Sequence, residues 1–293
     1  MRKYVSLAAL ALLVSGCEKG VEISSFDPAE IRVEALLPES RATLTKFEQG
    51  DKMSLYAVEY SGEEVAELQT YGNYLNNEPM VYNGAEWRSE RTLYWAQSHC
   101  DFYGIYPYQE LGAMSDYLFE LPIDQSTPET ADAISGYEAA DIMWAKAEKV
   151  SREDGKVNLQ FKHMMSRVVV DIVRGKSYEG ELPKDIDVHI YNTLTSAIVD
   201  WRIGSLKADQ QGSRKTIKMR QVDGDTFDAI VVPQFIQRST PLIEITMEGI
   251  AYLLESSASL RPGKQHHFEI TLNTSPDQEK IEISVGGSVG GWD

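Results

Sequence analysis

The sequence predicts an all-β protein made of two β-sandwich domains. Apolar and polar residues alternate in short runs, spaced roughly ten to fifteen residues apart, which is typical of sandwiches and unlike βαβ units. Thr, Val and Ile recur in these runs, and the 15 Tyr and 5 Trp also favour strands over helices. The 293 residues exceed what one core usually serves, so we expect two domains of about 140 residues each.

The longest strand-like stretch covers residues 156–174. Odd-numbered positions from Val157 to Phe161 are apolar, and the pattern changes to even-numbered positions from Val168 to Ile172. One extra residue must therefore be absorbed near residues 163–167, most simply by a bulge. We expect both halves of the stretch then to face one core.

The polar residues 149–155 lie just upstream and lack apolar periodicity, so they indicate a linker or a long turn. We expect a leader at residues 1–16, an N-terminal β-sandwich domain at 17–150 and a C-terminal β-sandwich domain at 156–293.

Short alternating runs predict the individual strands. Asn83 and Gly84 fit the positive φ angles of a two-residue hairpin turn, so the runs on either side of them are expected to pair. The predicted strands lie at residues 31–35, 53–58, 80–82, 85–87, 92–95, 101–106, 117–121, 186–191, 198–203, 216–219, 227–232, 242–247, 251–256 and 267–272.

The first 17 residues indicate export and a lipid anchor. A basic start at Arg2 and Lys3 precedes an apolar run of about eleven residues, which is too short to span a bilayer. The small residues before Cys17 resemble the lipobox of bacterial lipoproteins, in which this thiol is acylated and begins the mature chain. Acyl chains such as palmitate on Cys17 would tether the protein to the outer membrane with its body at the cell surface.

Nothing else in the sequence indicates catalysis, a metal or a cofactor. The net charge of −17 disfavours nucleic acid as a partner. Ser288 lies in a G-x-S-x-G pattern, but no helix and no later His follow it, so a flexible glycine-rich tail is expected. His266 and His267 are adjacent on a strand and would point to opposite faces. We expect His163 and Cys100 to be core residues.

A series of short motifs resembles the fimbrillin-like lipoproteins, a family that includes major, minor and Mfa-like fimbrillins, of Gram-negative gut and oral anaerobes. The motifs cover nearly the whole mature chain in the order of that family. They are residues 40–43, Phe47, Gly50, Asp51, Trp87, Trp95, and residues 106–108, 124–126, 141–145, 161–163 and 232–234.

This resemblance implies two tandem transthyretin-like β-sandwich domains and a fimbrial (pilus) subunit or fimbria-associated adhesin, with other fimbrial subunits and a host or bacterial surface protein or glycan as partners. It also implies that an arginine-specific protease cuts between Arg41 and Ala42, which would remove the strand at residues 31–35. Ile281, Ile283 and Val285 alternate with polar residues, so this segment has the character of a donor strand, with glycines 286–291 as its tether. Three alternatives stay open: a segment that simply completes its own domain, a monomeric lipoprotein that binds glycan, and an anchored hydrolase.

Overall fold

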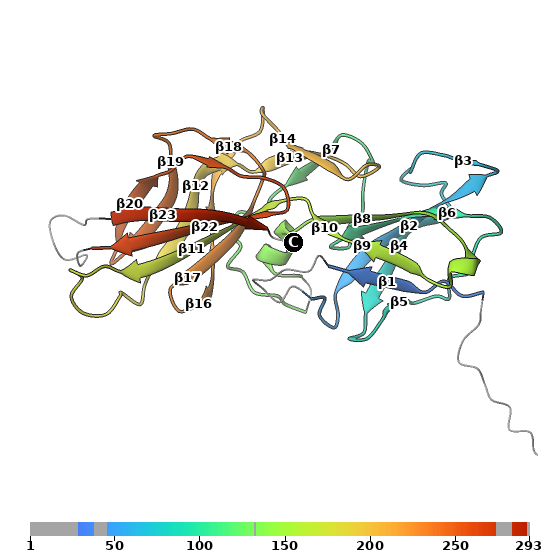
Figure 1. Cartoon of the computed structure of the whole chain (residues 1–293), viewed down its shortest axis with the longest axis horizontal. Coiled ribbons are helices and arrows are strands. Elements are labelled where there is room, and N and C mark those ends of the chain that lie inside the picture. The colour runs from blue at the N-terminus through green and yellow to red at the C-terminus, as the bar shows by residue number, and fades with distance from the viewer. Residues whose placement is uncertain (1–28, 38–45, 132, 274–282, 292–293) are drawn as a thin grey trace, which may run out of the picture.

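The computed structural model describes residues 29–37, 46–131, 133–273 and 283–291, and within them it consists almost entirely of strands, which confirms the all-β prediction. Figure 1 shows an elongated molecule with two groups of strands side by side along its long axis. We call the group formed by the nine-stranded sheet the first lobe and the group formed by the other sheets the second lobe.

The first lobe is one sheet that wraps around a core. Its strands, in spatial order, are β10 (Lys162–His163), β8 (Met143–Val150), β6 (Cys100–Tyr106), β2 (Lys52–Ser61), β4 (Leu75–Tyr82), β5 (Trp87–Ser89), β1 (Val33–Leu36) and β9 (Val157–Gln160), with β3 (Glu64–Val65) beside β2. Met53, Leu55, Phe102 and Leu159 are fully buried in its centre, which we call the first core. Gly104 lets β9 cross closely over β6, because a Cβ there would lie 2.6 Å from Phe161.

The second lobe is built from four smaller sheets. They are β16 (Arg220–Asp223), β17 (Thr226–Val231), β11 (Ser166–Arg174), β22 (Lys264–Leu272) and β23 (Ile283–Gly291); β15 (Arg214–Lys218), β12 (Asp187–Leu194), β19 (Pro241–Met247) and β20 (Ile250–Glu255); β14 (Ser205–Ala208), β13 (Ser196–Asp200) and β7 (Tyr117–Glu120); and β18 (Phe235–Ile236) with β21 (Ala258–Ser259). Apolar side chains from the β11 and β12 sheets meet in the second core. These two sheets therefore form a sandwich.

The two cores do not divide the chain at the predicted joint. A 3₁₀ turn, Arg152–Asp154, occupies the expected linker, but β9 follows it and pairs with β1 in the first lobe. In the opposite direction, β7 comes from the first half of the chain and pairs with β13 in the second lobe. Each of the predicted ranges, 17–150 and 156–293, therefore contributes at least one strand to the lobe that the other range mainly forms.

The change of phase within residues 156–174 has a different cause from the one expected. Val157 and Leu159 lie in the first core, whereas Val168 and Val170 lie in the second. The chain leaves the first lobe after β10 and enters the five-stranded sheet at Ser166. The prediction that both halves face one core is therefore wrong, because the alternation restarts in a new sheet.

Two strands of the first lobe are buried on both faces. In β2, Leu55 packs in the first core and Tyr56 in the second. In β6, Phe102 packs in the first core and Tyr103 in the second. The turn after β13 covers this second face: Trp144 Nε1 donates to the Trp201 carbonyl at 2.7 Å, and Gly204 leaves room for the Trp144 ring. The lobes thus share a hydrophobic contact.

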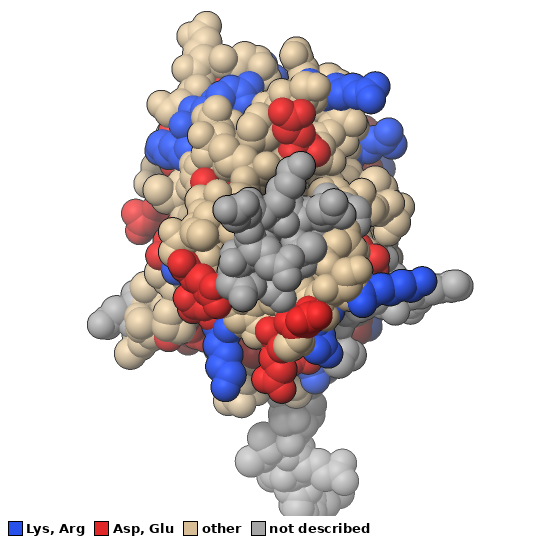
Figure 2. Space-filling view, turned by 90° about the vertical axis from the view of Figure 1, so that its left-hand side faces the viewer, with Lys and Arg blue, Asp and Glu red and all other residues tan. Residues whose placement is uncertain are grey.

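A short helix, α1 (Gly136–Ala140), also joins the lobes. Its residue Tyr137 lies under the guanidinium of Arg220, 3.3 Å from the ring centre, and Arg220 and Arg167 both pair with the fully buried Asp228. Figure 2 looks at the second-lobe end of the molecule, where acidic and basic side chains are interspersed. Among the described residues no helix has the length and apolarity needed to cross a bilayer.

The hairpin predicted at Asn83 and Gly84 is confirmed as a pair of strands, but its turn is longer than expected. Tyr82 pairs with Trp87, so four residues connect β4 to β5. The Asn83 side-chain oxygen accepts hydrogen bonds from the backbone N–H groups of Ala85 and Glu86, both at 2.9 Å. This Asx-type arrangement fixes the longer turn.

Candidate assembly site

Some of the predicted functional segments lie in the strands β1 and β23. The other predicted residues lie outside the described part of the chain. Cys17, Arg41, Ala42 and Ile281 fall in segments that the structure does not describe. The predicted N-terminal strand is found two residues later than expected, as β1, Val33–Leu36. Ile283 and Val285 lie in β23. The site is therefore described from β1 and β23.

β1 lies between two neighbours that hold it unequally. It runs parallel to β9 with four residue pairs, from Val33 with Val157 to Leu36 with Gln160. On its other side, the pairing with β5 consists of one residue pair, Val33 with Trp87. Upstream of β1 the chain bonds instead to the next loop, where Ile31 N–H donates to the Leu93 carbonyl at 2.7 Å.

The side chains of this segment are part of the first core. Ile31 and Val33 are 5% and 6% exposed. Burying an aliphatic side chain of this size contributes about 1.5–3 kcal/mol, so the two together stabilise the attachment of β1 substantially. If β1 were absent, the sheet would have unpaired backbone groups on β9 and an open apolar stripe beside Trp87.

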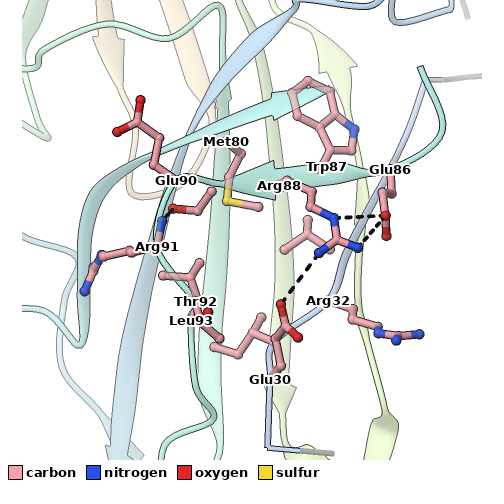
Figure 3. Close-up of a pocket in the computed structure, with 13 residues that line it drawn as sticks. Glu30, Arg32, Met80, Glu86, Trp87, Arg88, Glu90, Arg91, Thr92 and Leu93 are labelled. Carbon is pink, nitrogen blue, oxygen red and sulfur yellow. Dashed lines mark hydrogen bonds and ion pairs between the residues drawn. The ribbon is translucent and has the colours of Figure 1, made fainter. Parts of the chain in front are cut away.

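A cavity of about 270 Å³ lies where β1 and β5 separate. Figure 3 shows Arg88 on its rim, reaching Glu86 of the preceding turn and Glu30 ahead of β1. The Arg88 guanidinium lies 2.6 Å from Glu86 and 4.0 Å from Glu30. These three charged side chains, Arg88, Glu86 and Glu30, therefore link β5 to the segment before β1 where the β1–β5 ladder is missing. We call them the clamp.

The end of β1 leads toward a second group of charges. Leu37 lines a pocket together with Asp51, Tyr106 and Glu138. The Tyr106 hydroxyl donates to Glu138, and the Asp51 carboxylate also lies within hydrogen-bonding range of Tyr106. Burial raises the pKa of both Asp51 and Glu138 above the ordinary carboxyl values. These acids therefore favour the protonated form more than exposed carboxyls do.

β23 differs from its prediction. The glycines expected to form a flexible tether are part of the strand, which pairs antiparallel with β22 over nine residues, from Ile283 with Leu272 to Gly291 with Lys264. Val285 and Val289 remain 39% and 63% exposed. β23 thus completes its own sheet here, at an edge, with little side-chain burial.

The motif around Ser288 does not form a nucleophile site. Ser288 pairs with His267 across the β22–β23 ladder, and His267 Nε2 lies 2.7 Å from Asp171. The Ser288 hydroxyl makes no hydrogen bond to His267, and the serine lies within a strand instead of at a strand-to-helix turn. The three residues form a polar ladder on the exposed sheet face.

The other candidate residues are placed as core or paired groups. His266 is buried and His267 partly exposed, which agrees with the expected opposite faces. His163 is buried beside Asp141, with 2.8 Å between Nδ1 and the carboxylate. Burial raises the pKa of Cys100 to about 12, so its thiol is not reactive. Within the described residues, no cluster of three or more His, Cys, Asp or Glu is placed to hold a metal ion.

The sequence pattern did not predict the contacts between the two lobes. Trp144 lies in β8, whereas Trp201 and Gly204 lie in the turn after β13, so spacing gave no indication that they meet. The one available signal was Trp201 itself, at the end of the predicted strand 198–203 and shortly before Gly204, since a tryptophan has a large apolar surface to bury.

Comparison with known proteins places this fold in a family. A Bacteroides ovatus protein described as a candidate fimbrium tip subunit, Fim1C, is 29% identical over 195 residues, which cover 58% of this chain and 35% of that protein. This chain thus spans about a third of that relative.

Two solved structures share the fold. A candidate cell adhesion protein from Bacteroides uniformis is 22% identical with a TM-score of 0.65, covering 91% of this chain and 100% of that one. Another from Bacteroides ovatus is 15% identical with a TM-score of 0.68, covering 90% and 98%. The family model described as "Fimbrillin-like" matches residues 40–292, and this chain therefore belongs to the fimbrillin-like family.

Proposed function

We propose that this chain is a fimbrial subunit or a fimbria-associated adhesin, held at the outer membrane by acyl chains on Cys17 and exposed at the cell surface. Membership of the fimbrillin-like family supports this, together with adhesion and fimbrial descriptions among its relatives. We infer no enzymatic role, because those relatives are described by adhesion and Ser288 lacks the context of a nucleophile.

The position of β1 is the single observation that carries an assembly role. β1 is a short strand second from the edge of its sheet, paired fully with the edge strand β9 and by one residue pair with β5, and it lies five residues upstream of Arg41. Hydrolysis of the peptide bond between Arg41 and Ala42 would leave β1 attached by non-covalent contacts alone. A strand from a neighbouring subunit could then take its place, with alternating apolar side chains entering the first core.

The donor strand in this scheme is the segment with Ile281, Ile283 and Val285. Val285 is partly exposed, and β23 is an edge strand, so release of this segment would cost little side-chain burial. The partner is accordingly another copy or a related subunit, joined by backbone pairing and apolar side chains.

Protease treatment tests assembly directly. A chain beginning at residue 18 is incubated with an arginine-specific protease and run without boiling on a denaturing gel, beside an Arg41→Ala control and a chain truncated after Glu279. We expect a ladder from the parent alone. A clean cut at Arg41 that leaves only monomer, or the same ladder from the truncated chain, would refute strand exchange while leaving the lipid anchor untouched.

The anchor has its own test. Mass spectrometry of the mature N-terminus should find a diacylglyceryl cysteine at Cys17, and Cys17→Ser should leave an uncleaved or soluble form. Protease shaving of intact cells should remove the protein from the surface. An unmodified N-terminus at another residue would rule out the lipid anchor.

A monomeric binder of glycan is the second candidate, favoured by a group of exposed tyrosines. Tyr74 and Tyr94 are 38% and 52% exposed, and the Tyr74 hydroxyl donates to the Tyr94 carbonyl at 2.8 Å. Aromatic faces held in this way can stack on sugars. Immunogold labelling distinguishes the candidates: label along filaments or at their tips supports the fimbrial role, and label confined to the membrane supports the binder.

A further inference from the structure

A cavity of about 740 Å³ lies along the edge strand β23. It is lined by β22, by β23 and by residues 256–259, which follow β20 and include β21. β23 pairs with β22 on one side and with no described strand on the other, so the sandwich is open at this edge. Ligand pockets have volumes of about 300–1,000 Å³, so the cavity is large enough for a small molecule. We call it the edge cavity.

The walls of the edge cavity combine hydroxyl groups with an apolar surface. Ser256, Ser257 and Ser259 line one side, and a serine hydroxyl both donates and accepts hydrogen bonds. The apolar surface comes from Val285 and Val289, which remain exposed on β23. The described lining residues include no Asp or Glu, although the chain has 45 of them against 28 Lys and Arg. An anionic ligand would therefore meet no like charge on these walls.

Arg261 supplies the available positive charge. Three other basic residues line the edge cavity, but His267 Nε2 lies 2.7 Å from Asp171, and Lys264 takes part in another interaction. Burial, together with the charge of Arg261, lowers the pKa of His266, so its imidazole is neutral at pH 7. Arg261 is exposed, and no carboxylate among the described residues pairs with its guanidinium. One cation in the edge cavity is thus free to bind a ligand.

We propose that the edge cavity binds a carboxylated sugar, with the Arg261 guanidinium paired to the sugar carboxylate. A guanidinium matches a carboxylate through two parallel hydrogen bonds, and one available cation balances one negative charge. The serines exchange hydrogen bonds with the sugar hydroxyls, while Val285 and Val289 contact the C–H groups of the ring. As an adhesion site, the edge cavity rests on the surface role proposed above.

Ligand-observed NMR on the purified chain from residue 18 tests the proposal, with D-glucuronate, D-galacturonate and N-acetylneuraminate as probes. We expect at least one of them to bind with a dissociation constant on the order of 1 mM. D-glucose lacks the charge and propionate lacks the hydroxyls, so each should bind at least about tenfold more weakly. Binding of none of the three acidic sugars, or equally strong binding of D-glucose or propionate, would overturn the proposal.

Variants with matched controls locate the bound sugar. Arg261→Ala should weaken binding at least about tenfold, and Arg261→Lys should weaken it less, because lysine keeps the charge without the paired hydrogen bonds. Val289→Asp adds a carboxylate to the wall and should also weaken binding about tenfold. The controls Arg238→Ala and Val222→Asp change exposed residues outside the edge cavity and should bind within about twofold of the parent.

All four substituted positions are exposed, so the variants should fold, and their circular dichroism spectra should match that of the parent. Unchanged binding by Arg261→Ala, or an equal loss in the controls, would overturn the assignment to the edge cavity. The measurement needs neither cells nor filaments. Immunogold label on filaments without sugar binding would therefore reject this site alone, and sugar binding without such label would reject the fimbrial role alone.

Discussion

β1 and β23 are held in their sheets by opposite means. β1 has four residues, and its segment is fixed by Ile31 and Val33 in the first core and by the ladder with β9. β23 has nine residues and a complete ladder with β22, but glycines and exposed valines contribute little burial. Length of pairing is thus a poor guide to how firmly a strand is retained, because apolar burial contributes more than ladder bonds exchanged with water.

The largest expected difference between β1 and β23 comes from replacing one valine by aspartate in each strand. Val33→Asp should lower the free energy of unfolding by about 3 kcal/mol or more, since it buries an unpaired carboxylate. Val289→Asp, at an exposed position of β23, should change it by less than about 0.5 kcal/mol. Urea denaturation measures both, and equal losses would show that the two strands are retained alike.

A matched pair of glycine substitutions gives the next largest effect. Gly104→Ala would place a Cβ 2.6 Å from Phe161 beneath β9, so we expect a loss of about 1–3 kcal/mol. Gly290→Ala meets nothing within 4 Å in β23 and should stabilise the fold by about 0.5 kcal/mol through the unfolded state. Thermal unfolding distinguishes them; a stabilising Gly104→Ala would contradict the close crossing of β9 over β6.

The pH dependence of stability should differ in sign between the two regions. Near β1, burial raises the pKa of Glu138, so its contribution to stability is present at acid pH and lost as the pH rises through the folded-state value. Near β22, burial acts to raise the pKa of Asp171, but hydrogen bonds from Thr226 and His267 lower it on balance, and its contribution is lost as the pH falls.

Unfolding measured from about pH 3 to 7 checks these signs against the unperturbed carboxyl range. The stability difference between the parent and Glu138→Gln should be more favourable to the parent at pH 4 than at pH 7. For Asp171→Asn the parent's advantage should be greatest at pH 7. Glu255→Gln, at an exposed carboxylate, is the control. Parallel profiles for both variants would rule out the opposing shifts.

The smallest effect concerns the clamp between β5 and the start of β1. Arg88 and Glu86 have side chains that are 57% and 48% exposed, and such surface pairs contribute about 0.2–1 kcal/mol. Arg88→Ala should cost no more than this, and the loss should disappear in high salt. A larger loss that salt does not reduce would mean that Arg88 supports β1 by packing.

The sequence allowed the strands to be predicted better than their partners. Alternation located β2, β6 and β19 because each has at least one face in a core, and that pattern is local. Residues 92–95 looked equally strand-like, yet they form a loop with one isolated bridge at Tyr94. Whether a run finds a partner depends on distant segments, which periodicity does not encode.

The same limit applies to the assembly site. A strand near residues 31–35 was predictable from its alternation, but its unequal neighbours were not, since β5 and β9 lie far away in the sequence. The glycines of β23 were interpreted as a tether because glycine weakens strands in general. At Gly287 a Cβ would lie 2.9 Å from the His267 carbonyl oxygen, so the close approach of β22 accounts for glycine there.

The chain passes between the lobes at β7, returns at β8 and crosses again at β11. Genetic recombination between two relatives within residues 149–155 would join the β1 of one parent to the β9 of the other, across four paired positions. It would also separate β7 from the β13 with which it pairs. Such a recombinant would carry mismatched strand pairs in both lobes. We therefore expect the two lobes to be exchanged between relatives only together, unlike independently folding domains joined by a linker.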